Sequence, residues 1–162
     1  MGEQDAGNPA DTPPDAAIGS AAPADAPLAC AATYNLISST SRYRVAPADT
    51  WVNAEKACEA DGFGMHLVLI ANYAEQQKIE GYVGGTALSW VGISDRKTND
   101  TFLDVSGAAA TYLPWAATYP SFAGPGCVIL DPVSRNYTDG DCTQALAYVC
   151  ECDLLAADPT SY

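Results

Sequence analysis

The feature that most constrains the fold is a cysteine-rich segment near the end of the chain, from Cys127 to Cys152. It holds four of the six cysteines and two short apolar runs, residues 128–130 and 147–149. Their β-branched and aromatic residues are typical of buried strands. The polar stretch between them, residues 136–142, is interpreted as an acidic turn. The cysteines flanking this stretch could close the loop between them, and the last two cysteines must find partners earlier in the chain. Cysteine counting alone leaves that pairing open.

The even number of cysteines favours disulfides over a zinc site. The chain has no Cys-x-x-Cys pair and a single histidine, His66. Disulfides form in oxidising compartments, so we expect a protein that is secreted or anchored at the cell surface. The 162 residues contain no hydrophobic export signal and no apolar run long enough to span a bilayer. We therefore expect that the export signal has been removed from this chain and that the protein does not insert directly into a membrane.

The charge of the chain restricts its partners. Twenty acidic residues against seven basic ones give a formal net charge of −13. Such a surface repels nucleic acid and anionic lipid, so we expect neither as a partner. Neutral ligands, cations and basic proteins remain.

Composition divides the chain into three parts. Residues 1–28 are mostly Ala, Pro, Asp and Gly, which bury too little apolar surface to offset the entropy of ordering. We predict a disordered tether there, a folded domain over residues 29–154, and a flexible C-terminal tail over residues 155–162.

Within the domain, the sequence predicts two helices. The first spans residues 51–58 after a cap at Asp49-Thr50, and places Trp51, Ala54 and Cys58 on one face. The second opens at the capping box Asn72-Tyr-Ala-Glu75 and ends at Gly84-Gly85.

Short strands are expected around these helices, at residues 32–37, 42–45, 66–70 and 89–93. No periodic pattern follows until Cys127. The intervening loop is rich in Gly, Pro and aromatic residues, which indicates a packed, functional loop.

The order of these parts resembles the C-type lectin-like domain over roughly residues 30–153. The resemblance lies in Trp51 and Cys58 on the first helix, the Gly64-Met-His-Leu run, the second capped helix, the Trp90-Val-Gly-Ile run, the long loop and the cysteine-rich end. It implies an α+β fold with two helices, small antiparallel sheets, a long loop region and three disulfides. We expect a bacterial secreted or surface member of that family.

The resemblance also implies how the cysteines pair. The family's pattern gives Cys58–Cys150 and Cys127–Cys142. We pair the remaining Cys30 with Cys152, because the first and last strands of the family are neighbours.

In sugar-binding members of the family, calcium is held by a Glu-Pro-Asn triplet and a Trp-Asn-Asp motif. The matching positions here read Tyr119-Pro120-Ser121 and Tyr137-Thr138-Asp139. Calcium takes roughly six to eight oxygen ligands, and one aspartate among hydroxyls is a poor cage. We therefore expect no cofactor, with calcium possible only at a non-standard site.

Other polar residues allow weaker hypotheses. A second acidic set in the long loop could bind calcium, although Asp and Asn also favour turns, which is the interpretation we prefer: Asp95, Asn99, Asp100 and Asp104. Asp139 and Asp141 could suggest acid–base chemistry, but they alternate along a turn with no defined cleft. His66 is interpreted as structural, because no Ser or Cys motif accompanies it.

We expect the surface of the long loop to contact the ligand. The candidate residues are Trp115, Tyr119, Ser121, Phe122, Tyr137, Thr138 and Asp139. The alternative for the aromatic residues is that they pack the loop itself. Two segments, Asn99-Asp-Thr and Asn136-Tyr-Thr, also fit the N-glycosylation pattern.

These observations favour a non-catalytic extracellular module that binds a protein or a glycan through the long loop, without calcium-dependent sugar coordination. The alternative is a calcium-dependent carbohydrate-binding lectin with a non-standard site. An enzyme is disfavoured, because no nucleophile–base set is present.

Overall fold

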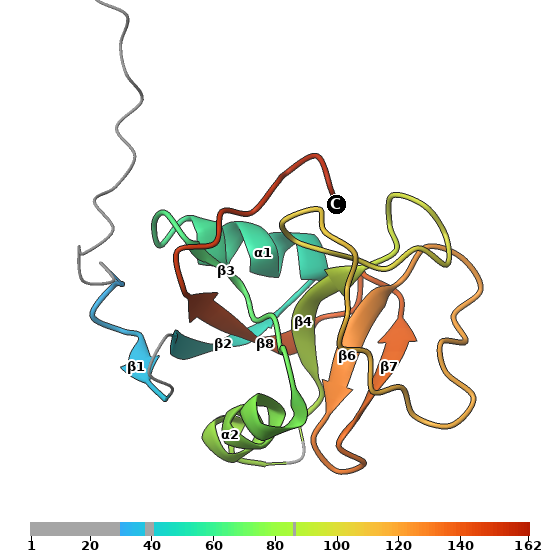
Figure 1. The fold of residues 1–162 in the computed structure, drawn as a ribbon, viewed down its shortest axis with the longest axis horizontal. Helices are drawn as coiled ribbons and strands as arrows, with labels where there is room; N and C mark the ends of the chain where they lie inside the picture. Colours follow the sequence, from blue (N-terminus) through green and yellow to red (C-terminus); the bar gives the residue numbers. More distant parts are fainter. Residues whose placement is uncertain (1–29, 38–40, 86) are drawn as a thin grey trace, which may run out of the picture.

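The computed structural model describes residues 30–37, 41–85 and 87–162 (Figure 1). The predicted tether, residues 1–28, lies outside the described residues. The elements are β1 (Asn35–Leu36), β2 (Arg42–Asp49), α1 (Trp51–Glu59), β3 (Met65–Leu67), α2 (Tyr73–Val83), β4 (Ser89–Ser94), β5 (Leu103–Asp104), β6 (Cys127–Asp131), β7 (Asn136–Gly140) and β8 (Leu146–Cys152). The predicted α+β fold with two helices is confirmed.

Both helices form where local sequence signals place them. Helix α1 buries Trp51, Ala54 and Cys58 on one face, as its spacing predicts. The Asn72 side chain caps α2 by accepting a hydrogen bond from the Glu75 backbone N–H at 3.0 Å. Gly84 ends α2 in the left-handed conformation, with φ of 60°.

The strands form one sheet in the order β1-β2-β8-β4-β6-β7, with β3 added to β8 and β5 added to β4. The pairs are antiparallel except β4 and β8, which run parallel where Ser89 and Trp90 face Ala147 and Tyr148. The expectation of small antiparallel sheets is thus corrected to a mixed sheet. The last strand inserts between β2 and β4, and local sequence patterns carry no signal for that long-range pairing.

The helices cover opposite faces of this sheet (Figure 1). Side chains along β8 alternate between the two faces. Tyr148 and Cys150 pack in the hydrophobic cluster around α1, while Val149 packs in the cluster that contains Ile79 of α2.

The polar stretch after β6 differs from expectation. Residues 136–140 are not a turn but the edge strand β7, paired with β6 from Cys127↔Gly140 to Asp131↔Asn136. The chain reverses before it, at residues 132–135, where Arg135 has φ of 58°. Tyr137 is fully buried in this strand, so its burial secures a segment whose other side chains are polar.

The structure contains the three expected disulfides: Cys30–Cys152, Cys58–Cys150 and Cys127–Cys142. Two of them, Cys30–Cys152 and Cys58–Cys150, close long loops, and each has one cysteine in β8. In the chain-entropy view, a loop of about 100 residues gains roughly 5 kcal/mol from such a bond, and a loop of about 15 residues gains about 3 kcal/mol.

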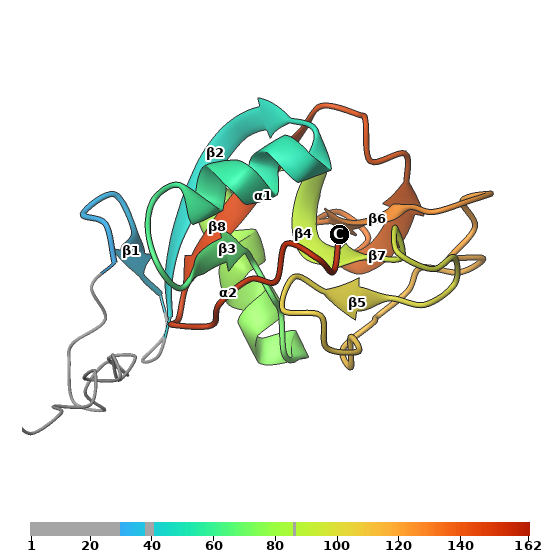
Figure 2. The ribbon, with the colours of Figure 1, turned by 90° about the horizontal axis from the view of Figure 1, so that it is seen from above.

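Residues 155–162, expected as a flexible tail, fold back between α1 and β5 (Figure 2). Ser161 is buried and its Oγ donates to the Val105 carbonyl. The Tyr162 hydroxyl donates to Glu59 at 2.6 Å, and its ring lies edge-on to Trp51 at 5.4 Å between centroids. Because one aromatic ring and one buried serine supply these contacts, the composition of the segment gives little sign of them.

Neither helix in the described part of the chain is long and apolar enough to cross a bilayer.

Candidate functional site

The long loop, residues 95–126, leaves the end of β4 and returns at the start of β6. Its two ends are held together by Asp95, which is only 3% exposed. One carboxylate oxygen of Asp95 accepts a hydrogen bond from the Gly126 N–H, and the other accepts from the Asp100 N–H at 2.7 Å. Asp95 therefore fastens the base of the loop to the turn that begins it.

The other members of the acidic loop set also serve turns. Oδ1 of Asp104 accepts hydrogen bonds from the backbone and hydroxyl of Ser106 and from the Ala108 N–H. Oδ2 of Asp100 accepts from the side-chain amide of Asn99 at 2.9 Å. Among the described residues, these side chains do not form a group compact enough to hold a metal ion. Their geometry favours the turn interpretation.

Trp115 lies in the middle of the long loop and contacts the edge strand β7. Trp115 is half-buried, packs against Phe102 with ring centroids 5.0 Å apart, and lies edge-on to Tyr137. The loop backbone follows the edge of β7: Ala116 N–H donates to the Tyr137 carbonyl, and Tyr137 N–H donates to the Pro114 carbonyl, both at 2.8 Å. Trp115 thus anchors the loop to the sheet.

The expected ligand contact by Tyr137 is corrected by its position. Its side chain is 0% exposed, beneath Trp115 and Tyr112. Its place in a polar run suggested a surface turn, whereas it points inward from β7. Burial raises the pKa of the Tyr137 hydroxyl above its ordinary value.

The remaining candidates come together at the tip of the loop. The Tyr119-Pro120 peptide bond is cis. The backbone N–H groups of Ser121 and Phe122 donate to the two carboxylate oxygens of Asp139, at 2.8 and 2.9 Å. Ser121 and Phe122 are exposed, whereas Tyr119 and Asp139 are half-buried. Asp139 therefore joins the loop tip directly to β7.

Thr138 and Phe122 lie on either side of this junction between β7 and the loop tip. Thr138 is half-buried on β7, next to Asp139. The Phe122 ring leans on the loop base, since a Cβ added at Gly126 would lie 3.2 Å from it. Phe122 still keeps 38% of its surface exposed.

This arrangement does not fit the calcium cage of sugar-binding relatives. At the matching positions stand the phenol of Tyr119, the hydroxyls of Ser121 and Thr138, and a single carboxylate. That carboxylate, Asp139, already accepts a backbone hydrogen bond at each oxygen. Calcium takes roughly six to eight oxygens, several of them anionic or amide oxygens, and these residues do not supply them.

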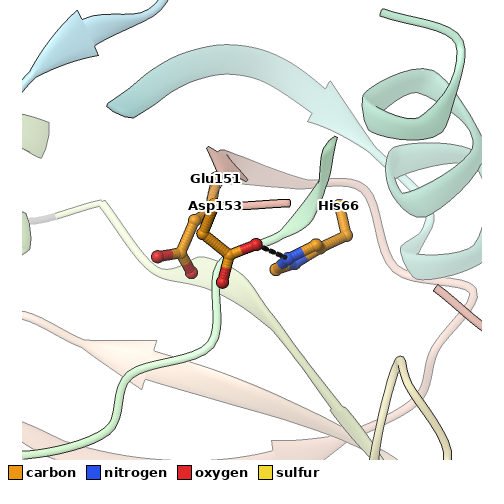
Figure 3. A group of neighbouring side chains, drawn as sticks. All are labelled: His66, Glu151 and Asp153. Atoms are coloured by element: carbon orange, nitrogen blue, oxygen red, sulfur yellow. Dashed lines mark hydrogen bonds and ion pairs between the residues drawn. The ribbon is translucent and has the colours of Figure 1, made fainter. Parts of the chain in front are cut away.

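A second group of polar side chains lies in the core beside β3 and β8 (Figure 3). His66, Glu151 and Asp153 are the group of His, Cys, Asp and Glu side chains in the described ranges whose ligand atoms lie close enough for one ion. His66 and Glu151 face each other across the β3–β8 pairing, and both are buried. Of this group only His66 stands out in the sequence, and its buried position agrees with a structural role.

Both ring nitrogens of His66 are engaged. Nδ1 donates to the Leu67 carbonyl at 2.8 Å, and Nε2 donates to the Asp153 carboxylate at 3.0 Å. Burial opposes the charge on the ring, but these hydrogen bonds outweigh it and raise the pKa of His66 to about 9. Burial also disfavours the ionised form of Asp153, yet the contact with His66 holds its pKa below the ordinary value. With Nε2 of His66 against the Asp153 carboxylate and Nδ1 against a backbone carbonyl, His66 and Asp153 have the geometry of an ion pair.

Two buried glutamates, Glu151 and Glu55, lie near the His66–Asp153 ion pair, and neither was among the residues singled out from the sequence. Oε2 of Glu151 accepts from the Leu69 N–H at 3.0 Å, and Oε2 of Glu55 accepts from the Leu67 N–H at 2.7 Å. Burial raises the pKa of each carboxyl to about 7. Their sequence positions carried a signal: Glu151 lies between two cysteines of a buried strand, and Glu55 lies four residues after Trp51 on the buried face of α1.

In the described part of the chain, the cysteines and the carboxylates of Asp139 and Asp141 have structural partners. All six cysteines are in disulfides. Asp139 binds the loop backbone, whereas Asp141 accepts hydrogen bonds from the backbone and hydroxyl of Thr143, which lower its pKa. The two carboxylates thus serve separate turns and do not form an acid–base pair.

The chain is similar to proteins of a known family. The model of the family described as "Lectin C-type domain" matches residues 48–152. Lithostathine from Rattus norvegicus is 29% identical over 131 residues, which cover 76% of this chain and 79% of that protein. C-type lectin domain family 10 member A from Homo sapiens is 29% identical over 112 residues, 65% of this chain, but the match spans only 34% of that longer protein. These relatives are animal proteins and give no support to the expected bacterial origin.

Solved structures agree with the fold. The carbohydrate-recognition domain of the mouse scavenger receptor C-type lectin superimposes with a TM-score of 0.69 at 22% identity, over 80% of this chain and all of that one. A calcium-independent type II antifreeze protein superimposes with a TM-score of 0.67 at 25% identity, over 83% of this chain and 99% of that one. With its mixed sheet, two helices and three disulfides, the chain belongs to the C-type lectin domain family.

Proposed function

We propose that residues 29–154 form a non-catalytic extracellular recognition domain, carried on residues 1–28 as a tether. The domain binds a protein or a glycan through the tip of the long loop, around Tyr119, Ser121 and Phe122, and does so without calcium. Thr138 and Asp139 border this surface from β7, and Trp115 anchors the same loop to that strand.

The observation that carries the proposal is the pair of hydrogen bonds from Asp139 to the backbone of Ser121 and Phe122. A carboxylate whose two oxygens each accept a backbone N–H is already partnered. The loop tip is thereby fixed by the protein itself, so a ligand meets a preformed surface and recognition needs no bridging ion.

The side chains at the loop tip suit direct contact with a ligand rather than coordination of a metal ion. Phe122 offers an apolar ring, and Tyr119 offers a ring with one hydroxyl. Aromatic rings of this kind pack against protein side chains or stack on sugar rings, and they dominate binding energy when they anchor an interface.

The comparisons support the same reading. The similar proteins include lectins and receptors, and one similar structure is that of a protein described as calcium-independent. Three disulfides fit an oxidising compartment, which supports secretion or display at a cell surface.

The test is a glycan and protein array probed in calcium and again in chelator. We expect capture of a ligand that is unchanged by the chelator. Phe122→Ala and Tyr119→Ala should then weaken capture by about 1–2 kcal/mol each if these rings are anchors. Val133→Ala is the matched control, because Val133 is 69% exposed on the turn at the opposite end of the β6–β7 hairpin. Normal capture by folded Tyr119→Ala and Phe122→Ala proteins would exclude the loop tip as the binding surface.

A calcium-dependent carbohydrate-binding lectin is the second candidate, and membership of the lectin family favours it. It requires oxygen ligands other than the family's usual set. Retention on immobilised sugars that is lost in chelator would support this second function and reject the first.

A further inference from the structure

The two N-glycosylation segments of the sequence occupy different environments in the fold. Asn99 lies in an exposed turn between β4 and β5, whereas Asn136 is the first residue of β7 and is half-buried. Attachment of a glycan adds a bulky, hydrated group, so the folded protein must leave room for it. The two sites differ in this respect.

In the first segment all three residues, Asn99, Asp100 and Thr101, are exposed. The backbone is held by a bond from Thr101 N–H to the Thr98 carbonyl at 3.0 Å and by a bond from Asp100 N–H to Asp95. The amide of Asn99 makes one contact, an exposed hydrogen bond to the neighbouring Asp100 carboxylate. Water can replace such a bond at little cost, so the amide is free to carry a substituent.

In the second segment the middle residue, Tyr137, is fully buried and pairs with Leu130 of β6. The Asn136 amide nitrogen donates to the Ser134 carbonyl at 2.7 Å, within the turn that starts β7. Because the transferase of the secretory pathway acts before the domain folds, a glycan on Asn136 would break the amide hydrogen bond in this turn and keep the neighbouring Tyr137 out of the core. Removing a buried aromatic side chain costs roughly 3–5 kcal/mol.

We propose that Asn99 is an acceptor for an N-linked glycan and that the folded, secreted protein carries none at Asn136. The donor is a lipid-linked oligosaccharide diphosphate, supplied with its transferase by a eukaryotic secretory pathway. A bond forms between Asn99 Nδ2 and C1 of the first sugar, while the bond from C1 to the diphosphate oxygen breaks. The lipid diphosphate leaves with that electron pair, and one amide proton passes to a base of the transferase.

The position of this glycan follows from the contacts of Asp95. Asp95 binds both the Asp100 N–H and the Gly126 N–H, so the turn that holds Asn99 lies beside the base of the long loop. The glycan therefore stands at the rim of that loop and leaves the opposite end of the β6–β7 hairpin uncovered.

The experiment expresses the whole chain behind a cleavable export signal in cultured eukaryotic cells, with a secreted glycoprotein as control for transferase activity. We expect one gel-mobility shift that peptide N-glycosidase removes, with mass spectrometry locating the modified peptide at Asn99. The shift should be lost in Asn99→Gln and in Thr101→Ala, which keeps the asparagine but destroys the pattern. It should persist in Thr101→Ser and in Asn136→Gln.

Each opposite outcome rejects the proposal. An unshifted wild-type protein secreted beside a glycosylated control would show that Asn99 is not an acceptor. A shift that survives Asn99→Gln and disappears in Asn136→Gln would show that the assignment of the two sites is reversed. Unchanged melting temperatures of Asn99→Gln and Thr101→Ala establish that loss of the shift is not loss of folding.

Discussion

In two regions of the molecule, carboxylates bind backbone N–H groups with different consequences. Beside β3 and β8, Glu55 and Glu151 are enclosed by the core, and their pKa values rise to about 7. In the long loop, Asp95 and Asp139 bind backbone N–H groups of segments distant in sequence and so hold the loop in shape. The comparison teaches that an acidic loop need not be a metal site, because a carboxylate can organise a loop by itself.

The largest expected effect tests the core. Trp90 is fully buried and its indole N–H donates to the Asp49 carbonyl at 3.0 Å. Trp90→Ala should cost about 3–5 kcal/mol of unfolding free energy, enough to unfold a marginal domain. Urea denaturation followed by circular dichroism measures it, with Val133→Ala as the exposed control. A Trp90→Ala protein as stable as wild type would mean that the disulfides alone hold this region.

The buried glutamates should make stability depend on pH. The pKa of Glu55 is raised in the folded state from 4.5 to about 7, so its contribution is fully present below pH 4.5 and lost as pH rises through 7. Glu151 acts in the same sense over the same range. His66 acts in the same sense at higher pH. Its pKa is raised from 6.5 to about 9, so its stabilising contribution is fully present below pH 6.5 and is lost as pH rises through 9. The domain should therefore be more stable at pH 5 than at pH 8.

The variant Glu55→Gln sharpens this prediction. It removes one titrating group while keeping the shape of the side chain, so the loss of stability between pH 5 and pH 8 should shrink by on the order of 2–3 kcal/mol. Urea denaturation at several pH values measures the change. An unaltered pH profile in Glu55→Gln would show that Glu55 is ionised in the folded protein throughout. Asp153 acts in the opposite sense, because its lowered pKa makes its contribution disappear only as pH falls below 3.8.

Substitutions of the two loop carboxylates, Asp95 and Asp139, should differ in their cost to stability because the two sites differ in burial. Asp95→Asn places an amide against two backbone N–H groups in a buried site, and should cost about 2 kcal/mol. Asp139→Asn disturbs exposed bonds, so it should cost about 1 kcal/mol or less, yet speed hydrogen exchange at Ser121 and Phe122. Denaturation and amide exchange measure both. Equal costs would contradict the distinction between a buried loop base and an exposed tip.

The smallest expected effect concerns calcium. Because the loop tip supplies one carboxylate that is already bonded, millimolar calcium should leave the melting temperature where chelator leaves it. A tight site would stabilise the domain by on the order of 3–4 kcal/mol at several-hundredfold excess over the dissociation constant. A clear rise in melting temperature with calcium would reveal a cage that the family's usual positions do not provide.

Sequence reasoning succeeded where the signal is local. The cap of α2 at Asn72 and the buried face of α1 could be found from neighbouring residues, and the cysteine pairing followed from the resemblance to a family. It failed where the outcome depends on distant partners. The sequence of β7 is typical of a turn, because Tyr137 is its one large apolar residue. The parallel pairing of β4 with β8 joins distant segments and leaves no pattern in the local sequence.

The same limit applies to the candidate site. The sequence singled out the long loop and Asp139 as candidates, but it could not show that the backbone of Ser121 and Phe122 would bind that carboxylate. Nor could it show that Tyr137 points inward, or that Tyr162 returns to Trp51.

The placement of β8 has a consequence for how the protein is made. This strand, residues 146–152, pairs with β2, β3 and β4 and carries the partners of two long-range disulfides. During synthesis the earlier strands leave the ribosome with the centre of their sheet missing, and the apolar β4 has no partner on that side. The domain can therefore close only after nearly the whole chain has emerged, as expected for folds dominated by contacts between distant residues. Until then, correct pairing of Cys30 and Cys58 must wait for cysteines that have not yet been translated.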